Sequence, residues 1–299
     1  MLSILIPTYN YNIFHLVKSV HEQCLNAKIN FEIIVVDDAS TNTESVKFNT
    51  EVKQLSYTRH ILLKKNSGRS FARNYLASLS QFENLLFLDA DTLPIHSNFI
   101  EKYLKIIDLG YEVIYGGISY QIKKPQHFQI LRWIYGIDRE SVLASERQRS
   151  PYISFLTLNF LIKKTIIKQI PFNENIPNLR HEDTLFSFNL KENKIKISHI
   201  DNPVLHLGLE DSRTFLKKSE ESVWSLHHLI SNDLIPISYT KLGRAAFKLK
   251  TTKLDWVVLS LYGCSKKIIR QNLLSKKPSL FLMDFYRLGY YLYTSKNKI

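Results

Sequence analysis

The sequence of 299 residues contains only two cysteines, Cys24 and Cys264. Two cysteines form no disulfide framework, which argues against a disulfide-stabilised secreted domain and favours a reducing compartment. No apolar run approaches the ~18 consecutive residues that a membrane span requires. The apolar run at residues 2–6 lacks the basic flank and the small-residue cleavage site of a signal peptide. We therefore expect a cytoplasmic protein that is soluble or peripheral at the inner face of the membrane.

Acidic residues are scarce near the end of the chain. Residues 241–299 contain 13 lysines and arginines against two acids, so this segment carries +11 of the formal net charge of +13. The basic residues of a diffuse nucleic-acid footprint would also lie on the body of the protein, and here they are concentrated in the terminal segment. We therefore do not expect nucleic acid as a partner. The sequence predicts a main domain at residues 1–240 and a basic, aromatic-rich helical extension at residues 241–299.

Short apolar runs alternate with stretches of helical spacing in the first third of the chain. The runs predicted as buried strands are residues 3–6, 31–36, 60–64 and 85–88, and the helices predicted between them are residues 13–25, 43–55 and 68–79. Further along we expect strands at residues 113–119, 153–162 and 195–200 and helices at residues 98–109, 126–147, 163–169 and 185–190. This alternation is typical of an α/β fold with a mostly parallel sheet and helices on both faces.

Polar residues follow three of the predicted strands directly. The first strand is followed by Pro7-Thr8-Tyr9-Asn10, the second by Asp37-Asp38, and the fourth by Asp89-Ala90-Asp91. Ligands of such sheets bind beyond the carboxyl ends of the strands, so these segments should border one crevice. The G-x-G-x-x-G of a dinucleotide-binding fold is missing after the first strand, which argues against a dehydrogenase.

The two acidic pairs have both a functional and an ordinary interpretation. Asp89 and Asp91 leave a strand end on the same side, where two carboxylates repel unless a cation or donor lies between them. They could equally be a helix cap and a solvated loop carboxylate. Glu182 and Asp183 could remove a proton from a bound hydroxyl, or could simply cap a helix.

Four other positions leave the same choice open. Asp38 could bind a base or a ribose hydroxyl, or belong to a turn that favours aspartate. Tyr9 could stack on a base or pack at a loop, and Arg73 could contact phosphate or base, or lie on the surface. His206 follows a predicted strand and could ligate a metal, although a lone histidine is usually structural.

Six motifs in one order resemble the family 2 glycosyltransferases of the GT-A fold. They are SILIPTYN, EIIVVDDAS, NSGRSFARN, LLFLDADTLP, NFLIKK…IPFNE and HEDTLF. The resemblance covers roughly residues 1–210 and implies a GT-A fold, with its Rossmann-like sheet, followed by the basic extension. The sequence departs from the family pattern at His181, where many members have glycine.

The resemblance also implies roles for individual residues. Asp91 is the more direct metal ligand of a D-x-D motif, with Asp89 nearer the ribose. Asp183 corresponds to the catalytic base, with Glu182 beside it, and His206 corresponds to a metal ligand or a diphosphate contact. The residues implied in binding the nucleotide are Pro7, Thr8, Tyr9, Asp38, Arg73, Asp89 and Ala90.

The expected function is that of an inverting, metal-dependent glycosyltransferase. The donor would be a nucleotide-diphosphate sugar, in the common family case a UDP-sugar, and the acceptor a saccharide or a lipid-linked glycan. Mn²⁺ or Mg²⁺ would act as a Lewis acid on the departing diphosphate. Two alternatives are a sugar-phosphate nucleotidyltransferase, which would need a Gly-rich phosphate loop, and an inactive nucleotide-sugar-binding module.

The basic extension has two interpretations of its own. Apolar and aromatic residues such as Trp256 and Leu261 precede Lys266 and Lys267 at helical spacing. A basic amphipathic helix of this kind can lie in the interface of an anionic membrane, here near a lipid-linked glycan. Alternatively, the helices pack on the catalytic domain and keep their lysines in water.

Overall fold

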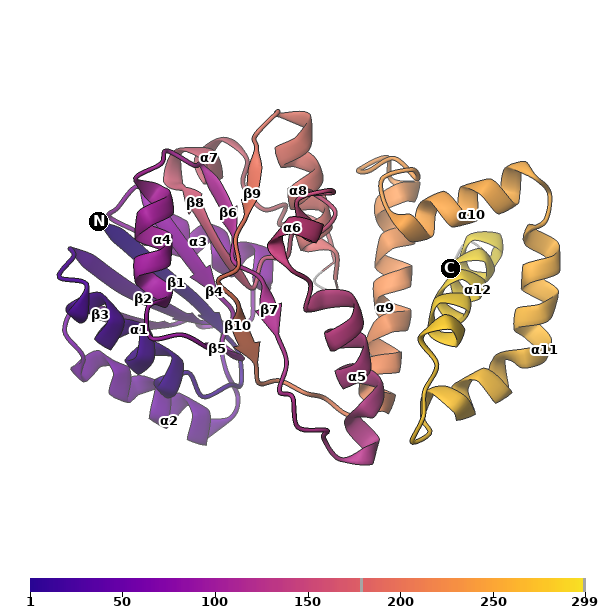
Figure 1. The fold of residues 1–299 in the computed structure, drawn as a ribbon, viewed down its shortest axis with the longest axis horizontal. Helices are drawn as coiled ribbons and strands as arrows, with labels where there is room; N and C mark the ends of the chain where they lie inside the picture. Colours follow the sequence, from indigo (N-terminus) through magenta and orange to yellow (C-terminus); the bar gives the residue numbers. More distant parts are fainter. Residues whose placement is uncertain (178–179, 298–299) are drawn as a thin grey trace. The chain divides into compact units, whose positions relative to one another are not determined.

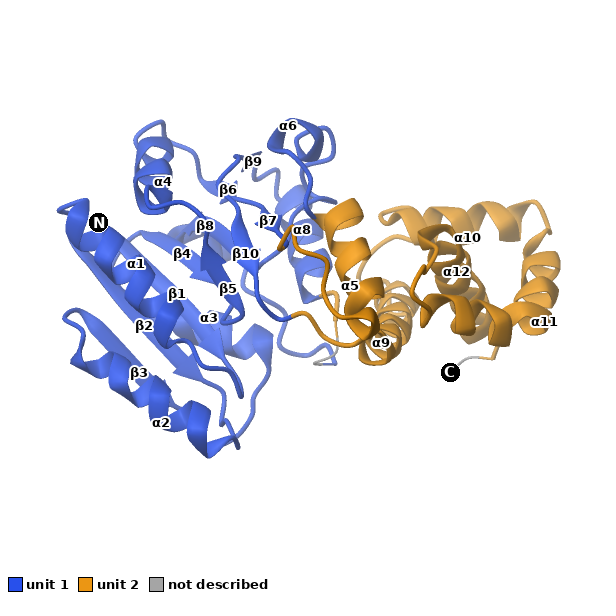
Figure 2. Cartoon of the chain, turned by 60° about the horizontal axis from the view of Figure 1, so that its bottom comes forward, with its two compact units in different colours: residues 1–120, 141–178, 182–208 blue, residues 121–140, 179–181, 209–299 orange. Residues whose placement is uncertain are grey.

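The computed structural model describes residues 1–177 and 180–297 (Figure 1). The chain forms two compact units, coloured separately in Figure 2. Unit 1 contains residues 1–120, 141–178 and 182–208, and unit 2 contains residues 121–140, 179–181 and 209–299. The boundary that the sequence places after residue 240 falls inside unit 2, and the division at that point stays a prediction.

Unit 1 is built on a seven-stranded sheet in the order β3-β2-β1-β4-β8-β6-β9. Its strands are β1 (Leu2–Thr8), β2 (Phe31–Asp37), β3 (Thr58–Leu62), β4 (Asn84–Leu88), β6 (Val113–Tyr115), β8 (Asn159–Lys163) and β9 (Ile197–His199). Neighbouring strands run parallel except at β8, which is antiparallel to both β4 and β6. The predicted mostly parallel α/β sheet is confirmed.

Each face of this sheet has its own hydrophobic core, because successive strand residues point to opposite faces. Ile4 and Leu86 belong to one core, and Leu5 and Phe87 belong to the other. The helices on the first face are α1 (Phe14–Asn26) and α4 (Phe99–Ile107). The helices on the second face are α3 (Arg69–Leu79), α7 (Lys164–Gln169) and α8 (Glu182–Glu192). Helix α2 (Thr43–Glu51) follows β2 and is continued by a short 3-10 helix, η1 (Val52–Gln54).

A second, three-stranded sheet in unit 1 has the order β5-β10-β7. Its strands are β5 (Thr92–Pro94), β7 (Ile118–Ser119) and β10 (Val204–His206). The sequence predicted one strand over residues 113–119, and this was wrong, because Gly116 and Gly117 divide it between the two sheets. Gly117 has a φ of 99°, and a Cβ there would clash with the Arg147 guanidinium. The kink therefore requires glycine.

The prediction of one continuous helix at residues 126–147 is also wrong. The segment is divided into η2 (His127–Gln129), α5 (Ile130–Tyr135), the π-helical turn η3 (Gly136–Glu140) and α6 (Ala144–Arg147). The break before α6 places the Arg147 side chain so that it donates to the carbonyl of Val142, at 2.8 Å. The predicted strand at residues 153–162 begins only at Asn159. The remaining predicted strands and helices are confirmed within a few residues at each end.

Unit 2 is helical. Besides α5, it contains α9 (Ser212–Ser231), α10 (Lys241–Thr251), α11 (Asp255–Leu273) and α12 (Leu280–Asn297). The helical extension is confirmed, whereas α9 was not predicted. Asp211 caps α9, since its side chain accepts hydrogen bonds from the amides of Arg213 and Thr214. In the part of the chain that the structure describes, no helix combines the length and the hydrophobicity that crossing a membrane requires.

Replacing Gly117 with alanine should destabilise unit 1. The left-handed backbone alone costs an alanine about 1–3 kcal/mol, and the clash with Arg147 adds to this. Urea denaturation measures the loss. Gly263→Ala is the matched control, because a Cβ at this position of α11 meets no atom within 4 Å. It should stabilise the protein by about 0.5–1 kcal/mol, and equal effects of the two substitutions would contradict this account.

Candidate active site

The carboxyl ends of β1, β2 and β4 lie at one edge of the large sheet. The three strands are parallel neighbours, with Thr8 opposite Asp37 in the β1–β2 pair. The amide of Asp38 donates to the Thr8 carbonyl at 2.9 Å, which joins the first two strand ends. The segments predicted to border one crevice therefore do meet at one edge.

The loop after β1 is held by Asn10. Its backbone has a φ of 53°, a left-handed conformation that asparagine tolerates. The Asn10 Oδ1 accepts from the amides of Thr41 at 2.8 Å and Asn42 at 2.9 Å. Tyr9 is 49% exposed, so its ring is available to a ligand. Thr8 is buried instead, and its hydroxyl donates to the carbonyl of Tyr11 at 3.3 Å.

Asp38 shapes the turn that leads into α3. Its buried carboxylate accepts from the amide of Ser67 at 2.7 Å and from that of Gly68 at 2.8 Å. Gly68 has a φ of 90°, which glycine adopts without strain. A carboxylate has about four lone-pair positions, so Asp38 can accept further hydrogen bonds from a ligand.

Arg73 joins the two acidic pairs. Its Nη2 lies 2.9 Å from Asp89 Oδ1, and its Nη1 lies 3.3 Å from Glu182 Oε1. Arg69, one turn earlier on α3, lies 3.5 Å from the same Glu182 oxygen. The Arg73 side chain is 2% exposed, and its guanidinium carbon lies 5.4 Å from the centre of the Phe172 ring. Both of its terminal nitrogens thus contact carboxylates of this chain.

Asp91 contacts His206, with 3.3 Å between Oδ2 and Nε2. The small sheet brings them together, since His206 lies opposite Thr92 and the amide of Leu207 donates to the Asp91 carbonyl at 2.8 Å. Burial by itself raises the pKa of Asp91, but the hydrogen bond with His206 lowers it below its ordinary value. Gly208 was missed from the sequence: a Cβ there would lie 2.5 Å from Asp91 Oδ2.

Glu182 and Asp183 open α8 in two different electrostatic environments. Burial raises the pKa of Asp183 to about 6, and the charge of Glu182 adds to this effect. Burial also acts on Glu182, but Arg69 and Arg73 outweigh it and lower its pKa to about 2. Divergent pKa values in adjacent carboxyls are typical of acid–base pairs. Glu182 is thus a permanent anion, whereas Asp183 can accept a proton near neutral pH.

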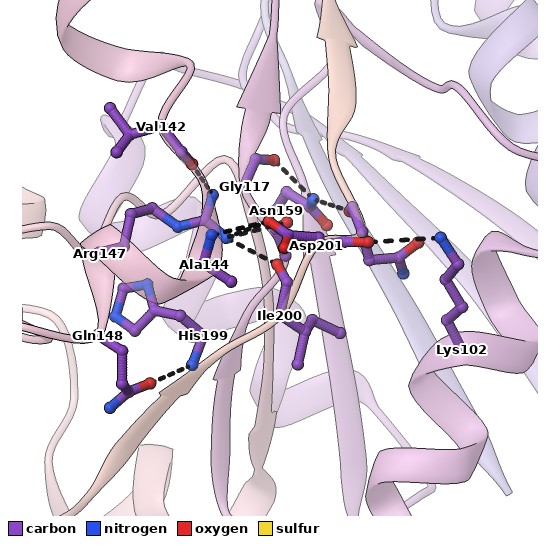
Figure 3. Close-up of polar contacts among 12 residues, drawn as sticks. Lys102, Gly117, Val142, Ala144, Arg147, Gln148, Asn159, His199, Ile200 and Asp201 are labelled. Atoms are coloured by element: carbon purple, nitrogen blue, oxygen red, sulfur yellow. Dashed lines mark hydrogen bonds and ion pairs between the residues drawn. The ribbon is translucent and has the colours of Figure 1, made fainter.

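A buried polar network supports the segment that leads to β10 (Figure 3). Arg147 Nη2 donates to the carbonyl of Ile200 at 2.7 Å. Asn159 Nδ2 donates to the carbonyls of Gly117 at 2.9 Å and Asn202 at 3.0 Å. These contacts fix the approach of the chain to His206. The sequence carried no signal for them, because the partners are distant along the chain.

The described residues provide only part of a metal site. Within them, no group of three or more histidine, cysteine, aspartate or glutamate side chains could hold a metal ion. Asp91 and His206 supply one oxygen and one nitrogen, and the buried His206 Nδ1 has no hydrogen-bond partner in the described chain. Asp89 is engaged by Arg73. Such a set fits a cation that shares its coordination with the phosphates of a ligand, and the imidazole suits Mn²⁺ better than Mg²⁺.

A cleft of about 600 Å³ lies on unit 1, and its lining includes none of the site carboxylates Asp38, Asp89, Asp91, Glu182 and Asp183. Its lining residues are Asn74, Gln169, Ile170, Pro171, Phe172, Asn173, Glu174, Asn175, Asn189 and Asn193. Amide side chains both donate and accept, so they match hydroxyl groups. Because neither lysine nor arginine is among the lining residues, the cleft is poorly suited to a phosphate.

The sequence matches the model of glycosyl transferase family 2 over residues 3–172. The chain belongs to this family. An uncharacterized glycosyltransferase of Haemophilus influenzae is 24% identical over 232 residues, which are 76% of this chain and 86% of that protein. An uncharacterized glycosyltransferase of Rickettsia felis is 31% identical over 121 residues, which are 40% of this chain and 19% of that protein.

Solved structures agree with this assignment at the level of the fold. Staphylococcus aureus TarS (residues 1–349) is 18% identical with a TM-score of 0.54, over 100% of this chain and 92% of that one. The mannosyltransferase PcManGT of Pyrobaculum calidifontis is 13% identical with a TM-score of 0.62, and the match covers 99% of this chain and 86% of that one. This family 2 glycosyltransferase therefore has the GT-A fold, as the motifs implied.

Replacing Arg73 with leucine should destabilise the glycosyltransferase by about 2–4 kcal/mol at pH 7, because Asp89 would lose its cation and Glu182 one of its two. Because the pKa of Glu182 is lowered in the folded wild type, its ion pair with Arg73 stabilises wild type above the ordinary pKa of 4.5. This stabilisation, which the variant lacks, is lost from wild type as pH falls. The deficit should therefore shrink below pH 4.5. Denaturation at several pH values measures it.

Arg149→Leu is the control, because the Arg149–Glu146 pair is largely exposed. It should change stability by no more than about 1 kcal/mol at any pH. A deficit in Arg73→Leu that stayed constant with pH would show that packing on Phe172, rather than charge, is what Arg73 contributes.

Proposed function

We propose that this glycosyltransferase transfers a sugar from a nucleotide-diphosphate donor, a UDP-sugar, to a hydroxyl of a saccharide or lipid-linked acceptor, with inversion at the anomeric carbon. The observation that supports this most directly is the pairing of two different carboxylate systems at one sheet edge. Asp91 with His206 has the character of a cation site, and Asp183 has that of a base. Arg73 contacts a neighbour of each, Asp89 beside Asp91 and Glu182 beside Asp183.

The donor would bind beyond the ends of β1, β2 and β4. Tyr9 offers an exposed ring for the base beside Pro7, Asp38 offers carboxylate lone pairs, and Ala90 lies between the two aspartates. Related GT-A structures support this choice of ligand: TarS was solved with UDP and with UDP-GlcNAc, and PcManGT with GDP-Man and Mn²⁺. The buried Thr8 would support the loop rather than contact the nucleotide.

Asp91 and His206 would hold the divalent cation, with Mn²⁺ as the first candidate and Mg²⁺ as the second. When bound, the cation offsets the negative charge that develops on the departing diphosphate. Asp89 would face the ribose while Arg73 holds its other side. Arg73 would then act on the nucleotide through Asp89, because its terminal nitrogens already contact Asp89 and Glu182.

Asp183 would serve as the general base. As the acceptor oxygen forms its bond to the anomeric carbon, its proton passes to the Asp183 carboxylate, and the bond from that carbon to the diphosphate oxygen breaks with its electron pair. Attack from the face opposite the leaving group inverts the centre. A glycosidase needs a second carboxyl as acid, but here the diphosphate leaves without protonation.

We infer further that the basic extension, residues 241–299, brings the enzyme to an anionic membrane surface. Its +11 formal charge supports this, since each Lys or Arg near such a surface contributes ~1 kcal/mol. A lipid-linked acceptor would be present at the same surface, in a pathway of polysaccharide biosynthesis.

The two alternatives lack supporting observations. A nucleotidyltransferase would need a Gly-rich phosphate loop after β1, where this chain has Pro7-Thr8-Tyr9-Asn10. An inactive binding module would have no use for Asp183, whose pKa is raised to about 6.

Asp91→Asn should reduce Mn²⁺-dependent turnover of a UDP-sugar at least about 100-fold, because the cation would lose its anionic ligand. The measurement is UDP release with a panel of UDP- and GDP-sugars in Mn²⁺ and in Mg²⁺. Asp108→Asn, a change of the same kind at the exposed end of α4, should leave the rate within twofold of wild type. If wild type turned over no donor with either metal, the inactive module would be favoured.

The pH profile tests the base. Asp183 acts only when ionised, so kcat/KM should rise tenfold per pH unit below its pKa of about 6 and level off above it. Asp183→Asn should lose about 10²–10⁴-fold in transfer while keeping donor affinity. Glu182→Gln removes the negative charge that helps to raise this pKa, so its profile should shift to lower pH.

A profile that did not move in Glu182→Gln, together with transfer retained in Asp183→Asn, would contradict the assignment of Asp183. Donor binding by titration calorimetry separates loss of the base from loss of the site.

A further inference from the structure

Helix α11 of unit 2 is buried along one side only. Tyr262, Ile269 and Leu273 are each at most 3% exposed and pack in one cluster with Met283 and Tyr286 of α12. Gly289 of α12 allows this approach, because a Cβ there would clash with the Tyr262 ring. The positions at 262, 269 and 273 follow helical spacing and therefore mark one side of α11.

The opposite side of α11 presents an apolar stripe. The α11 stripe consists of Val257, Leu261, Cys264 and Ile268, which recur at the i, i+4, i+7 and i+11 spacing of a single helix face. Leu261 is 56% exposed and Ile268 is 69% exposed. At the helical rise of 1.5 Å per residue, the stripe is about 16 Å long. Trp256, which is 66% exposed, precedes it.

Uncompensated positive charge accompanies the stripe. The only acid of α11 is Asp255 in its first turn, whereas exposed Lys253 precedes the helix and exposed Lys267 lies within it. Lys276 and Lys277 follow it and are also exposed. None of these four lysines forms an ion pair with the described residues, in contrast to Arg270, which lies 2.6 Å from Glu220.

We propose that the α11 stripe is the part of unit 2 that enters the interface of an anionic lipid bilayer. The helix lies parallel to the membrane surface, with its apolar side chains among the upper acyl chains and its lysines at the headgroups. Trp256 lies at headgroup depth, where its amphipathic ring is favoured. This proposal rests on the membrane association proposed above and specifies the surface that makes it.

Charge favours a lipid surface over a second copy of the chain. A two-fold symmetric dimer through the stripe would place the same surface on both sides and bring Lys253 and Lys267 of one copy near those of the other. Like charges facing each other across an interface are unfavourable. An anionic bilayer instead complements both the apolar stripe and the lysines.

The test is co-sedimentation of the full chain with vesicles of pure phosphatidylcholine and with vesicles that contain one-third phosphatidylglycerol. Wild type should bind the anionic vesicles at least tenfold more tightly, and less so at high salt. Leu261→Ser/Ile268→Ser should lose at least tenfold in binding. Phe128→Ser/Ile137→Ser, which also removes two exposed apolar residues of unit 2, is the matched control and should stay within twofold of wild type.

Charge and depth are tested separately. Lys253→Gln/Lys267→Gln should lose about fivefold in binding per lysine at low salt, which corresponds to ~1 kcal/mol each. An environment-sensitive dye on Cys264 reports depth without any substitution, because Cys264 is exposed and Cys24 is buried. Its emission should shift to shorter wavelength on anionic vesicles.

Several outcomes would overturn the proposal. One is wild-type binding by Leu261→Ser/Ile268→Ser, and another is co-sedimentation without a shift of the dye. A dimer in sedimentation velocity that this variant dissolves, with no vesicle binding by wild type, would assign the stripe to a second copy. UDP release measured without vesicles should be unchanged in Leu261→Ser/Ile268→Ser, so failure of the membrane proposal is distinguishable from failure of the proposed transfer activity.

Discussion

Arg73 is a guanidinium that has been taken almost completely out of water, and a charge in that position needs anions around it. Removing such a charge from water costs several kcal/mol, which good ion-pair geometry must offset. Arg73 meets this requirement with Asp89 at the end of β4 and Glu182 at the start of α8. The two acidic segments are distant in sequence, and the buried charge gives them a reason to stay adjacent. Asp38 contributes by holding the turn from which α3, and with it Arg73, begins.

The same charge distribution separates the carboxylates by function. Glu182 lies against two arginines and remains an anion, and its charge adds to the burial that raises the pKa of the neighbouring Asp183. Asp89 is paired with Arg73, whereas Asp91 is paired with His206. This difference is what the proposed roles require, in which Asp183 accepts a proton and Asp91 binds a cation. Composition alone does not provide this difference; the neighbours of each carboxyl do.

The parts of this arrangement that the sequence predicts are those with a local signal. Strands β1, β2 and β4 are buried on both faces and appear as continuous apolar runs, which locates Asp89 and Asp91 just beyond the end of β4. The sequence could not show the features that depend on how closely residues distant along the chain approach each other. The division at Gly116 and Gly117 follows from the closeness of Tyr103 and Arg147, and the need for Gly208 follows from the Asp91 carboxylate. Arg73 was predicted to contact a nucleotide, but its carboxylate partners emerge only from the folded chain.

His181 departs from the family pattern but has a backbone conformation typical of glycine. It stands where many members have glycine, and its φ of 70° is the left-handed conformation that glycine adopts most easily. A histidine in this conformation is strained by about 1–3 kcal/mol, and such strain persists where surrounding contacts hold the residue in place. The ring Nε2 of His181 lies 2.9 Å from the Ser222 hydroxyl, and the carbonyl of Arg180 accepts from Ser225 at 2.7 Å. These contacts with α9 hold residues 180 and 181 in place, so hydrogen bonding stabilises here a conformation that glycine adopts without strain.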